Sequence, residues 1–420
     1  MRWILFSAIV VIILSLYLFK GYRNNVCKTF SDYYTNTDHN ENCYYNPDAH
    51  LKVDEIVKRR GYPVEVHNIT TEDGYIITVF RIPFGKKKPS IKEKARQPVF
   101  LLHGGVFNSE SYINIGNKSL GFLLVDAGYD VWLGTFRGTK YARNHKSLST
   151  TERDFWNFSF HEMGIYDIPA QIDLVSDITK QEIIYIGYSL GATNAFVYGV
   201  TYPETARKKI KAFICLAPAA FLYEWKSPTK HILRFWSYIE PIAEYFTNGI
   251  LYLRLPHKLR SILCLPYPFQ MDICQFVDML LWGFDYEQSD PETLPITLIQ
   301  NSDAISIKTF SHISQLVING RKFQQFDYGQ NKNKEMYGTK EPPIYNLTEF
   351  RVPVYLIRSE NDFLVTKENI EKLNSSLPEK VKPYDIYVVR NERFNHGDFV
   401  IARDVVPLLY NHILDIITKF

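Results

Sequence analysis

The sequence predicts an α/β fold, with a mostly parallel sheet, helices on both faces and a helical cap inserted into it. Three observations support this prediction. Short runs rich in β-branched and aromatic residues alternate with segments of helical periodicity in the first and last parts of the 420-residue chain. A serine between two glycines, Ser189, stands at the turn from one such run into a helical pattern. Between residues 219 and 343, in contrast, aromatic residues recur at helical spacing and no clear strand is visible.

The first part of the core is expected at residues 44–218. A short helical pattern ends at Gly61, and two alternating strands flank the hairpin turn Glu72-Asp73-Gly74. Compact apolar runs then predict buried parallel strands, because a strand covered on both faces does not alternate. A helix is expected from His161 to Ile178. The expected strands are 64–69, 75–82, 97–102, 129–133, 182–187 and 211–216.

The cap and lid are expected at residues 219–345, and the second part of the core at 346–420. In that last part, strands are predicted at 352–357 and 385–389 and helices at 367–373 and 403–418. Two interpretations of the cap's many aromatic residues stay open. They form the cap's own core, or some of them line a pocket or face a lipid surface.

The strand-to-helix turn contains Gly187-Tyr188-Ser189-Leu190-Gly191, the pattern of a nucleophile elbow. The flanking glycines are needed because the turn is too tight for side chains at those places, and the serine is pushed out where a base can reach it. The alternative is an ordinary glycine turn. The strand before Ser189 and the helix after it favour the elbow.

A serine nucleophile needs a histidine base, and the base needs a carboxylate that fixes its tautomer and stabilises the imidazolium. In this architecture the chain order is serine, acid, histidine. Asp362 directly follows the predicted strand 352–357, and His396 lies in a turn after the last strand. The other late histidine, His412, falls inside a helical pattern and is expected to pack there. The sequence therefore predicts a triad of Ser189, Asp362 and His396.

Stabilisation of the tetrahedral intermediate requires N–H groups that point at its oxyanion. The N–H of Leu190, directly after the nucleophile, is one candidate. The second is the N–H of Gly105, in the glycine pair that follows His103 at the end of the strand 97–102. This chemistry requires no cofactor, and the cysteine spacing has no metal-ligand pattern.

The chain resembles the acid lipases, a family that includes lysosomal acid lipase, gastric lipase and many insect lipases. The resemblance begins at Asn46-Pro47 and covers nearly all of the chain after the first segment. It implies an α/β-hydrolase fold, a cap with a lid, and the same triad. The motifs that carry it are Gly61-Tyr62-Pro63, Thr71-Glu72-Asp73-Gly74-Tyr75, Arg81-Ile82-Pro83, Leu102-His103-Gly104, Asp126-Ala127-Gly128-Tyr129-Asp130-Val131-Trp132-Leu133-Gly134, Arg137-Gly138, Phe155-Trp156-Asn157-Phe158-Ser159-Phe160-His161-Glu162-Met163-Gly164 and Phe326-Asp327-Tyr328-Gly329.

The chain departs from the family pattern at a few places. Tyr188-Ser189-Leu190 stands where the family often has His-Ser-Gln, and Gly105 stands where it has leucine. Both oxyanion donors are backbone groups, so the hole survives these changes. Ser359 replaces a glycine usually found three residues before the acid. The segment Ser302–Ser311 has drifted most, and it bears on the choice of substrate.

Residues 1–24 combine a basic start with an apolar run from Trp3 to Phe19, which predicts a signal peptide or a retained signal-anchor. A cleaved signal peptide would give a secreted or lysosomal protein, and a retained signal-anchor would give a luminal protein anchored in the membrane. Five cysteines favour the short-loop disulfides Cys27–Cys43 and Cys264–Cys274, with Cys215 as a buried thiol. Sequons for N-glycosylation lie at Asn68, Asn117, Asn157, Asn346 and Asn374.

The main functional hypothesis is a serine lipase that hydrolyses lipid esters, triacylglycerols first and sterol esters as a second class, through an acyl-enzyme at a lipid–water interface. The alternative is a carboxylesterase acting on smaller hydrophobic esters with the same triad. A binding protein with a dead site would lack a triad residue, and a peptidase would need a charged side-chain pocket. The net charge of +3 does not favour nucleic acid. Nothing in the sequence indicates an oligomeric state.

Overall fold

The computed structural model describes residues 24–35, 38–87, 95–253, 257–264, 268–300, 303–319 and 321–420. The predicted signal segment, apart from Asn24, lies outside these residues. Within the described ranges, no helix is both long and apolar enough to cross a membrane.

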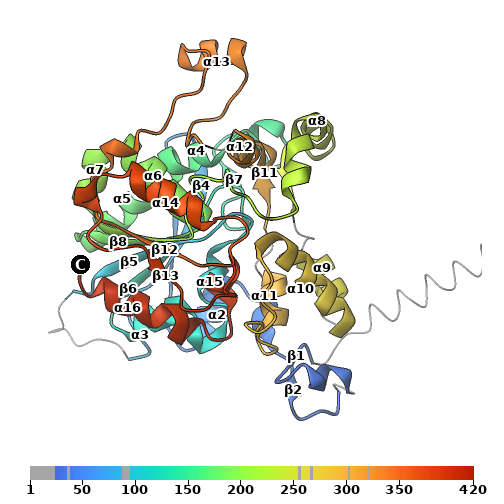
Figure 1. Ribbon diagram of the computed structural model, residues 1–420. Coiled ribbons are helices and arrows are strands. Elements are labelled where there is room, and N and C mark those ends of the chain that lie inside the picture. The colour runs from blue at the N-terminus through green and yellow to red at the C-terminus, as the bar shows by residue number, and fades with distance from the viewer. Residues whose placement is uncertain are drawn as a thin grey trace, which may run out of the picture.

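A nine-stranded sheet lies at the centre of the described chain (Figure 1). Its strands are β3 (Glu65–Thr70), β4 (Tyr75–Ile82), β5 (Pro98–Leu102), β6 (Asp130–Gly134), β7 (Asn144–His145), β8 (Ile183–Tyr188), β9 (Ile210–Leu216), β12 (Val354–Arg358) and β13 (Tyr387–Val388). They are ordered β13-β12-β9-β8-β5-β6-β4-β3, and β7 pairs with β4. The run from β13 to β6 is parallel, and β4 pairs antiparallel with its neighbours. The predicted mostly parallel sheet is confirmed.

Helices cover both faces of this sheet. On one face lie α3 (Leu120–Asp126) and α16 (Asn411–Ile417), and on the other lie α5 (Ile168–Thr179), α6 (Leu190–Thr201) and α14 (Lys367–Ser376) (Figure 1). Every residue of β5, β6 and β8 is buried, as expected for strands covered on both sides. The other α-helices of the first and last parts of the chain are α2 (Val53–Arg59), α4 (Phe160–Glu162), α7 (Pro203–Lys209) and α15 (Asp398–Ile401).

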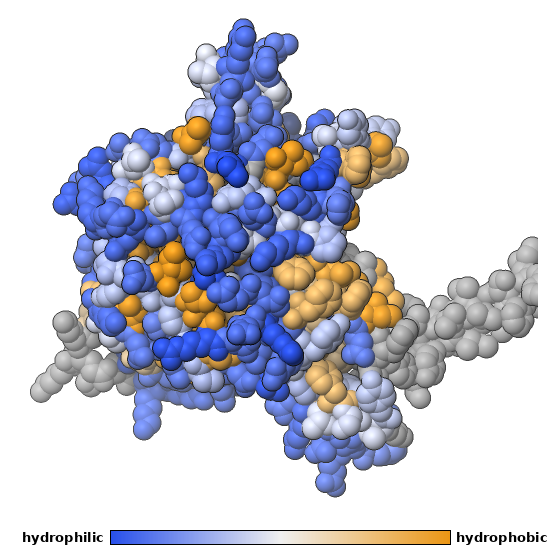
Figure 2. Space-filling model, in the orientation of Figure 1, coloured by the Kyte–Doolittle hydropathy of each residue, from blue (hydrophilic) through white to orange (hydrophobic). Residues whose placement is uncertain are grey.

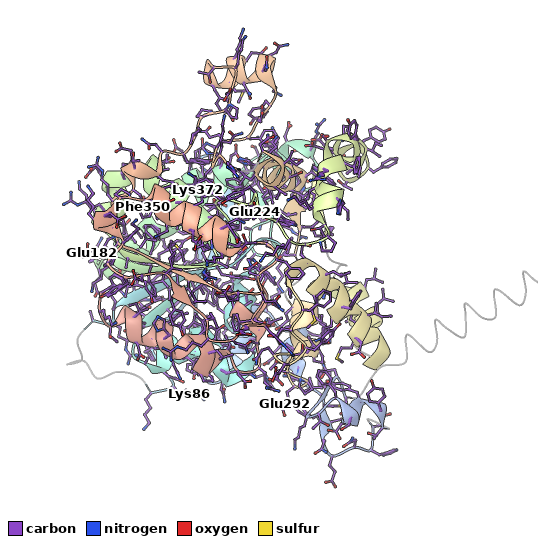
Figure 3. The ribbon with its side chains drawn as sticks, in the orientation of Figure 1. Lys86, Glu182, Glu224, Glu292, Phe350 and Lys372 are labelled. Carbon is purple, nitrogen blue, oxygen red and sulfur yellow. A yellow bond between two sulfur atoms is a disulfide. The ribbon has the colours of Figure 1, made fainter. Side chains whose placement is uncertain are left out.

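Aromatic side chains fill the layer between the sheet and α6. Phe350, labelled in Figure 3, precedes β12. Its side chain is fully buried and packs against Phe196 of α6 and Phe213 of β9. A Cβ atom at Gly199 would lie 2.3 Å from the Phe350 ring, so α6 packs closely there. The His412 ring stacks on the Tyr387 ring and forms a hydrogen bond with the Tyr355 hydroxyl. His412 therefore contributes to packing, as expected.

The expected continuous helix from His161 to Ile178 is interrupted. Between α4 and α5 the chain forms a π-helix at Met163–Asp167. Pro169 explains the break, because it has no N–H to donate to the Ile165 carbonyl one turn earlier. That carbonyl instead accepts a hydrogen bond from the Tyr202 hydroxyl at 3.1 Å.

The segment between β9 and β12 contains most of the remaining helices, at the right and top of Figure 1. They are α8 (Lys230–Thr247), α9 (His257–Cys264), α10 (Pro268–Trp282), α11 (Leu294–Gln300), α12 (Ile307–Ile318) and α13 (Gln330–Tyr337). The expectation that this segment has no strand is wrong, because β10 (Ile250–Leu251) pairs antiparallel with β11 (Ile305–Ser306). Two residues are too few to show an alternating pattern. The boundaries of the cap at 219 and 345 stay a prediction.

The N-terminal hairpin packs against this helical segment. It consists of β1 (Val26–Cys27) and β2 (Cys43–Tyr44), which the Cys27–Cys43 disulfide joins. The buried Tyr33 donates to the Pro291 carbonyl at 2.9 Å and joins a cluster with residues of α9, α10 and α11. The second disulfide, Cys264–Cys274, links α9 to α10, and Cys215 is a buried free thiol. Both predicted pairings are therefore present.

Candidate active site

Ser189 lies at the junction of β8 and α6, with φ 52° and ψ −113°. Its N–H donates to the Leu216 carbonyl of the neighbouring strand β9 at 2.8 Å. A Cβ atom at Gly187 would come within 2.7 Å of backbone atoms of Gly191 and Ala192, and one at Gly191 would lie 2.3 Å from the Leu102 carbonyl oxygen. Both glycines are therefore required by close backbone contacts, as the elbow pattern predicts.

The three residues of the predicted triad lie together at the carboxyl ends of the strands. His396 Nε2 is 2.9 Å from Ser189 Oγ, and its Nδ1 is 2.6 Å from Asp362 Oδ2. The side chains of Asp362 and His396 are almost fully buried, whereas Ser189 is partly exposed. The serine is thus the member of the group that a substrate can reach.

Asp362 is held by the turn that follows β12. Its Oδ1 accepts hydrogen bonds from the N–H groups of Leu364 and Val365, both at 2.8 Å. These bonds leave Oδ2 free to accept a hydrogen bond from the N–H at His396 Nδ1. The imidazole Nε2 then carries its lone pair toward the Ser189 hydroxyl, which is the tautomer that a general base needs.

The two predicted oxyanion donors lie on adjacent segments. A Cβ atom on Gly105 would be 3.5 Å from Leu190 Cδ2, so the loop after β5 lies against the first turn of α6. Within the described part of the chain, neither the Gly105 nor the Leu190 N–H donates to another group. Two free donors beside Ser189 fit an oxyanion hole, and that assignment stays a prediction.

His103 orders the loop that carries Gly105. Burial lowers the pKa of His103 to about 4, so the ring is neutral at physiological pH. Its Nε2 accepts the Phe136 N–H at 3.3 Å, and its protonated Nδ1 therefore donates to the Gly104 carbonyl at 2.8 Å. This bond fixes the peptide next to the proposed donor.

The end of α10 is in direct contact with the loops that carry Asp362 and His396. The sequence did not indicate this contact. The Trp282 carbonyl accepts the Phe363 N–H at 3.2 Å and the His396 N–H at 3.3 Å. The Gly283 carbonyl accepts a bond from the Asn395 side chain at 2.9 Å. Carbonyl groups occur in every residue, so no sequence signal marks these contacts.

Two buried carboxyl groups lie beside these loops. Asp398, two residues after His396, accepts the Asn395 N–H at 2.7 Å and pairs with Asp285 of the segment after α10. Burial and the neighbouring Asp285 raise the pKa of Asp398 well above its usual value, and burial also raises the pKa of Asp285. One proton shared by the pair keeps the two carboxyl groups together.

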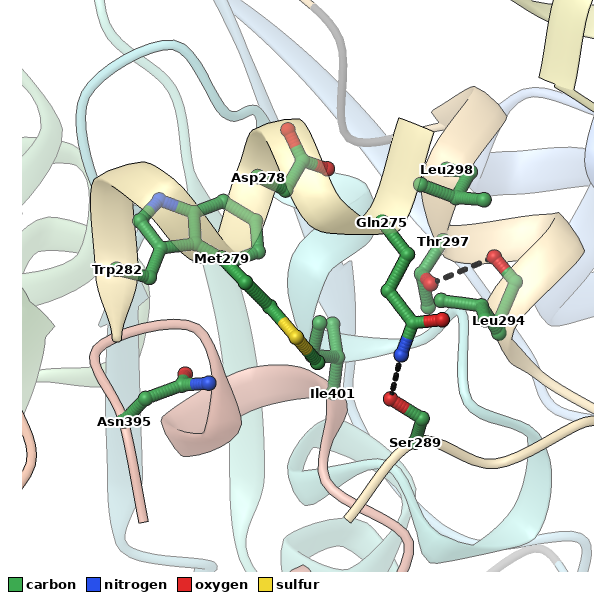
Figure 4. A pocket seen from close by; sticks show the side chains of 10 residues that line it. All are labelled: Gln275, Asp278, Met279, Trp282, Ser289, Leu294, Thr297, Leu298, Asn395 and Ile401. Atoms are coloured by element: carbon green, nitrogen blue, oxygen red, sulfur yellow. Dashed lines mark hydrogen bonds between the residues drawn. The ribbon is translucent and has the colours of Figure 1, made fainter. Parts of the chain in front are cut away.

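A small cavity of about 30 Å³ lies between α10, α11 and the core, beside Asn395, the residue before His396 (Figure 4). Trp282 and Met279 of α10, Leu298 of α11, and Asn395 and Ile401 from the core are among the residues that line it. Its size allows about two water molecules, at about 10–15 Å³ each. It is too small for an acyl chain.

Comparison with known proteins agrees with the fold and the motifs. A model for a partial α/β-hydrolase lipase region matches residues 53–116, and one for the α/β hydrolase fold matches residues 97–267. A solved candidate lipase from Sulfolobus solfataricus, 16% identical, superposes with a TM-score of 0.54 over 85% of this chain and 94% of its own, which supports the fold.

Several curated relatives are similar over nearly the whole chain. Lipase 1 of Drosophila melanogaster is 33% identical over 89% of this chain and 81% of its own. Human gastric triacylglycerol lipase is 34% identical over 89% of this chain and 92% of its own, and lipase member K of Mus musculus is 33% identical over 89% and 92%. The chain therefore belongs to the acid lipase family of α/β-hydrolase enzymes.

Proposed function

We propose that the protein is a serine lipase that hydrolyses triacylglycerols and related lipid esters with Ser189, Asp362 and His396. The observation that carries this proposal is the continuous hydrogen-bonded series from Asp362 through His396 to Ser189, with contacts of 2.6 and 2.9 Å. The triacylglycerol substrate is an inference from the gastric lipase relatives.

The geometry supports acyl transfer in two steps. Ser189 Oγ attacks the ester carbonyl while His396 Nε2 takes its proton, and Asp362 stabilises the imidazolium. The N–H groups of Leu190 and Gly105 stabilise the oxyanion, and His396 returns the proton to the departing alcohol. Water, activated by the same histidine, then attacks the acyl-enzyme, which releases the fatty acid and restores the serine.

A large apolar face supports a lipid–water interface as the partner. On α8 the side chains of Phe235, Tyr245 and Phe246 are 62%, 80% and 78% exposed. The same exposed stripe on α8 also contains Ile232, Tyr238, Ile239 and Ile242. A second exposed apolar stripe, on α10, consists of Ile273, Phe276 and Val277. Figure 2 shows apolar colour on this side of the molecule, over α8 and over the region of α9 and α10.

Such a face is costly in water. Full burial of one large apolar side chain contributes about 1.5–3 kcal/mol, so several such side chains together favour transfer of this face to an apolar phase. We propose that α8 and α10 rest on the surface of the lipid substrate.

The proposed mechanism is tested with a fluorophosphonate probe, which reacts with an activated serine. The wild-type protein should be labelled at Ser189 and should hydrolyse esters, and Ser189→Ala should lose both while it keeps its thermal stability, since only one oxygen is removed. Near-full ester hydrolysis by Ser189→Ala would show that the mechanism is wrong.

We also propose that the mature protein is luminal or secreted and N-glycosylated. The two disulfides fit an oxidising compartment. Of the five sequon asparagines, Asn68, Asn117, Asn157 and Asn346 are exposed and Asn374 is partly exposed. N-glycanase treatment of the cell-made protein should raise its gel mobility, and an unchanged mobility together with a cytosolic location would contradict this proposal.

A further inference from the structure

Tyr188, the residue directly before the nucleophile, contacts the catalytic base. Its hydroxyl donates a hydrogen bond to the carbonyl oxygen of His396 at 2.6 Å, and its ring centroid lies 5.2 Å from that of the imidazole. The side chain is fully buried. A residue of the elbow strand thus reaches the loop that carries the base, across 208 positions of sequence.

The tyrosine ring is itself held in place by close packing. It lies 5.9 Å from the Phe107 ring and 6.1 Å from the Phe399 ring, measured between centroids. A Cβ atom on Gly104 would lie 3.0 Å from the Tyr188 ring, so the loop with the oxyanion donor also presses on it. The backbone of Tyr188 belongs to the buried strand β8, so the residue is held rigidly and can support the loop that carries His396.

His396 is bonded at both of its backbone polar groups. Its N–H donates to the Trp282 carbonyl at 3.3 Å, and its carbonyl accepts from Tyr188. The bond from Tyr188 is shorter and comes from the same turn that carries Ser189. It therefore fixes the base relative to the nucleophile, whereas the other bond fixes it relative to α10.

We propose that Tyr188 is a positioning residue, whose hydroxyl holds His396 at the distance from Ser189 that proton transfer needs. This inference rests on the proposed triad.

Tyr188→Phe removes a single oxygen and leaves the ring packing intact. His396 takes and returns a proton in both halves of the reaction, so acylation and deacylation should slow together. We expect kcat to fall about tenfold, which corresponds to about 1.4 kcal/mol and is within the range of one buried hydrogen bond. KM should stay within about twofold, because Tyr188 does not contact the substrate.

Tyr410→Phe is the matched control. Tyr410 is equally buried, and its hydroxyl donates to the Phe399 carbonyl at 2.9 Å, in the helix that follows His396. This variant should lose a similar amount of thermal stability and keep kcat within about twofold. Rates are normalised to active sites counted with the fluorophosphonate, so that misfolded molecules do not contribute.

Tyr188→His is the second variant, and it should show the same loss per active site. A wild-type rate per site in either Tyr188 variant would overturn the inference, as would an equal fall in Tyr410→Phe. If Ser189 of the wild-type protein is not labelled at all, the proposed function fails instead. Labelling that depends on Ser189 but is as fast in Tyr188→Phe as in wild type disproves only the role of Tyr188.

Discussion

At the scale of single residues, the elbow depends on the absence of side chains at two glycines. Gly191→Ala would place its Cβ 2.3 Å from the Leu102 carbonyl oxygen and 2.6 Å from that of His103. Both are backbone atoms, one in the last residue of β5 and one in the residue after it, so they cannot rotate away. We expect this variant to lower kcat/KM at least 100-fold, about 2.7 kcal/mol, and to lower the melting temperature.

Gly85→Ala is a control for that prediction. Its Cβ would lie 3.6 Å from the nearest atom, which is an ordinary contact. Ester hydrolysis and thermal melting should be close to wild type. If Gly191→Ala were as active and as stable as Gly85→Ala, the close contact at the elbow would be wrong.

Asp362→Asn tests the role of the acid. The side-chain oxygen of asparagine can still accept the N–H groups of Leu364 and Val365, so the turn should persist. The amide, however, cannot both keep these bonds and accept a hydrogen bond from the N–H at His396 Nδ1, so the imidazole takes the wrong tautomer. We expect kcat to fall by about 10³–10⁴ with little change in melting temperature. A fall of less than tenfold would argue against Asp362 as the acid.

The three residues proposed as the triad could be predicted from the sequence because each follows a strand, in the order that the proposed chemistry requires. Ser189 has a tight glycine pattern, and Asp362 and His396 stand at the ends of late strands. Tyr188 could not be assigned, since its partner is a backbone carbonyl 208 residues away. The contact of Trp282 with His396 could not be predicted for the same reason, because it is made by the Trp282 carbonyl, which accepts the His396 N–H.

At the scale of elements, the segment after α10 and the helix α15 meet at the Asp285–Asp398 pair. In the unfolded chain Asp398 titrates near 3.8, and in the folded protein its pKa is well above that value. Below pH 3.8 Asp398 is protonated in both the folded and the unfolded state, so the pair does not lower the free energy of unfolding. As pH rises from there through the folded pKa, the folded state must give up a proton that it binds more tightly, so stability falls.

Asp398→Asn should remove this pH dependence. The amide can accept the Asn395 N–H with its oxygen and donate to Asp285, as the protonated carboxyl does. We expect a higher melting temperature than wild type at pH 7–8, and a smaller difference near pH 4. Asp415→Asn on α16 is the control for removal of an exposed carboxyl group, and it should lack the gain in melting temperature that Asp398→Asn shows at pH 7–8. A melting temperature that falls at pH 7 in Asp398→Asn would contradict the shared proton.

Long elements were easier to predict than short ones. The buried strands of the core were expected within a few residues of their observed bounds, since continuous apolar runs identify them. The helix expected at 161–178 is interrupted before Pro169, where the Ile165 carbonyl accepts the hydroxyl of Tyr202, a residue distant in sequence that lies between α6 and α7. β10 and β11 pair over only two residues each, a length with no detectable period.

At the scale of the whole molecule, the apolar side formed by α8 and α10 should decide how the enzyme meets its substrate. A triple variant removes three exposed side chains of α8 that make little contact with the core. Its substitutions are Phe235→Ser, Tyr245→Ser and Phe246→Ser. We expect hydrolysis of emulsified triacylglycerol to fall at least tenfold, since adsorption weakens, and hydrolysis of a soluble short-chain ester to stay within about twofold.

The control for this variant replaces exposed apolar residues on the core, Val66→Ser in β3 and Ile178→Ser in α5. Both activities should then remain at wild-type levels. Equal losses on emulsified and soluble substrates in the α8 variant would show that the face supports folding rather than adsorption.

The most direct test of lipid ester hydrolysis at an interface is the rate on one triacylglycerol as its concentration passes the solubility limit, with Ser189→Ala as the blank. The exposed face of α8 and α10 predicts a sharp rise in rate when emulsion forms. Longer acyl chains should then be preferred, at about 0.8 kcal/mol for each methylene group that is buried on binding. The highest rates on short soluble esters, with no rise on emulsion, would contradict the account and identify a carboxylesterase.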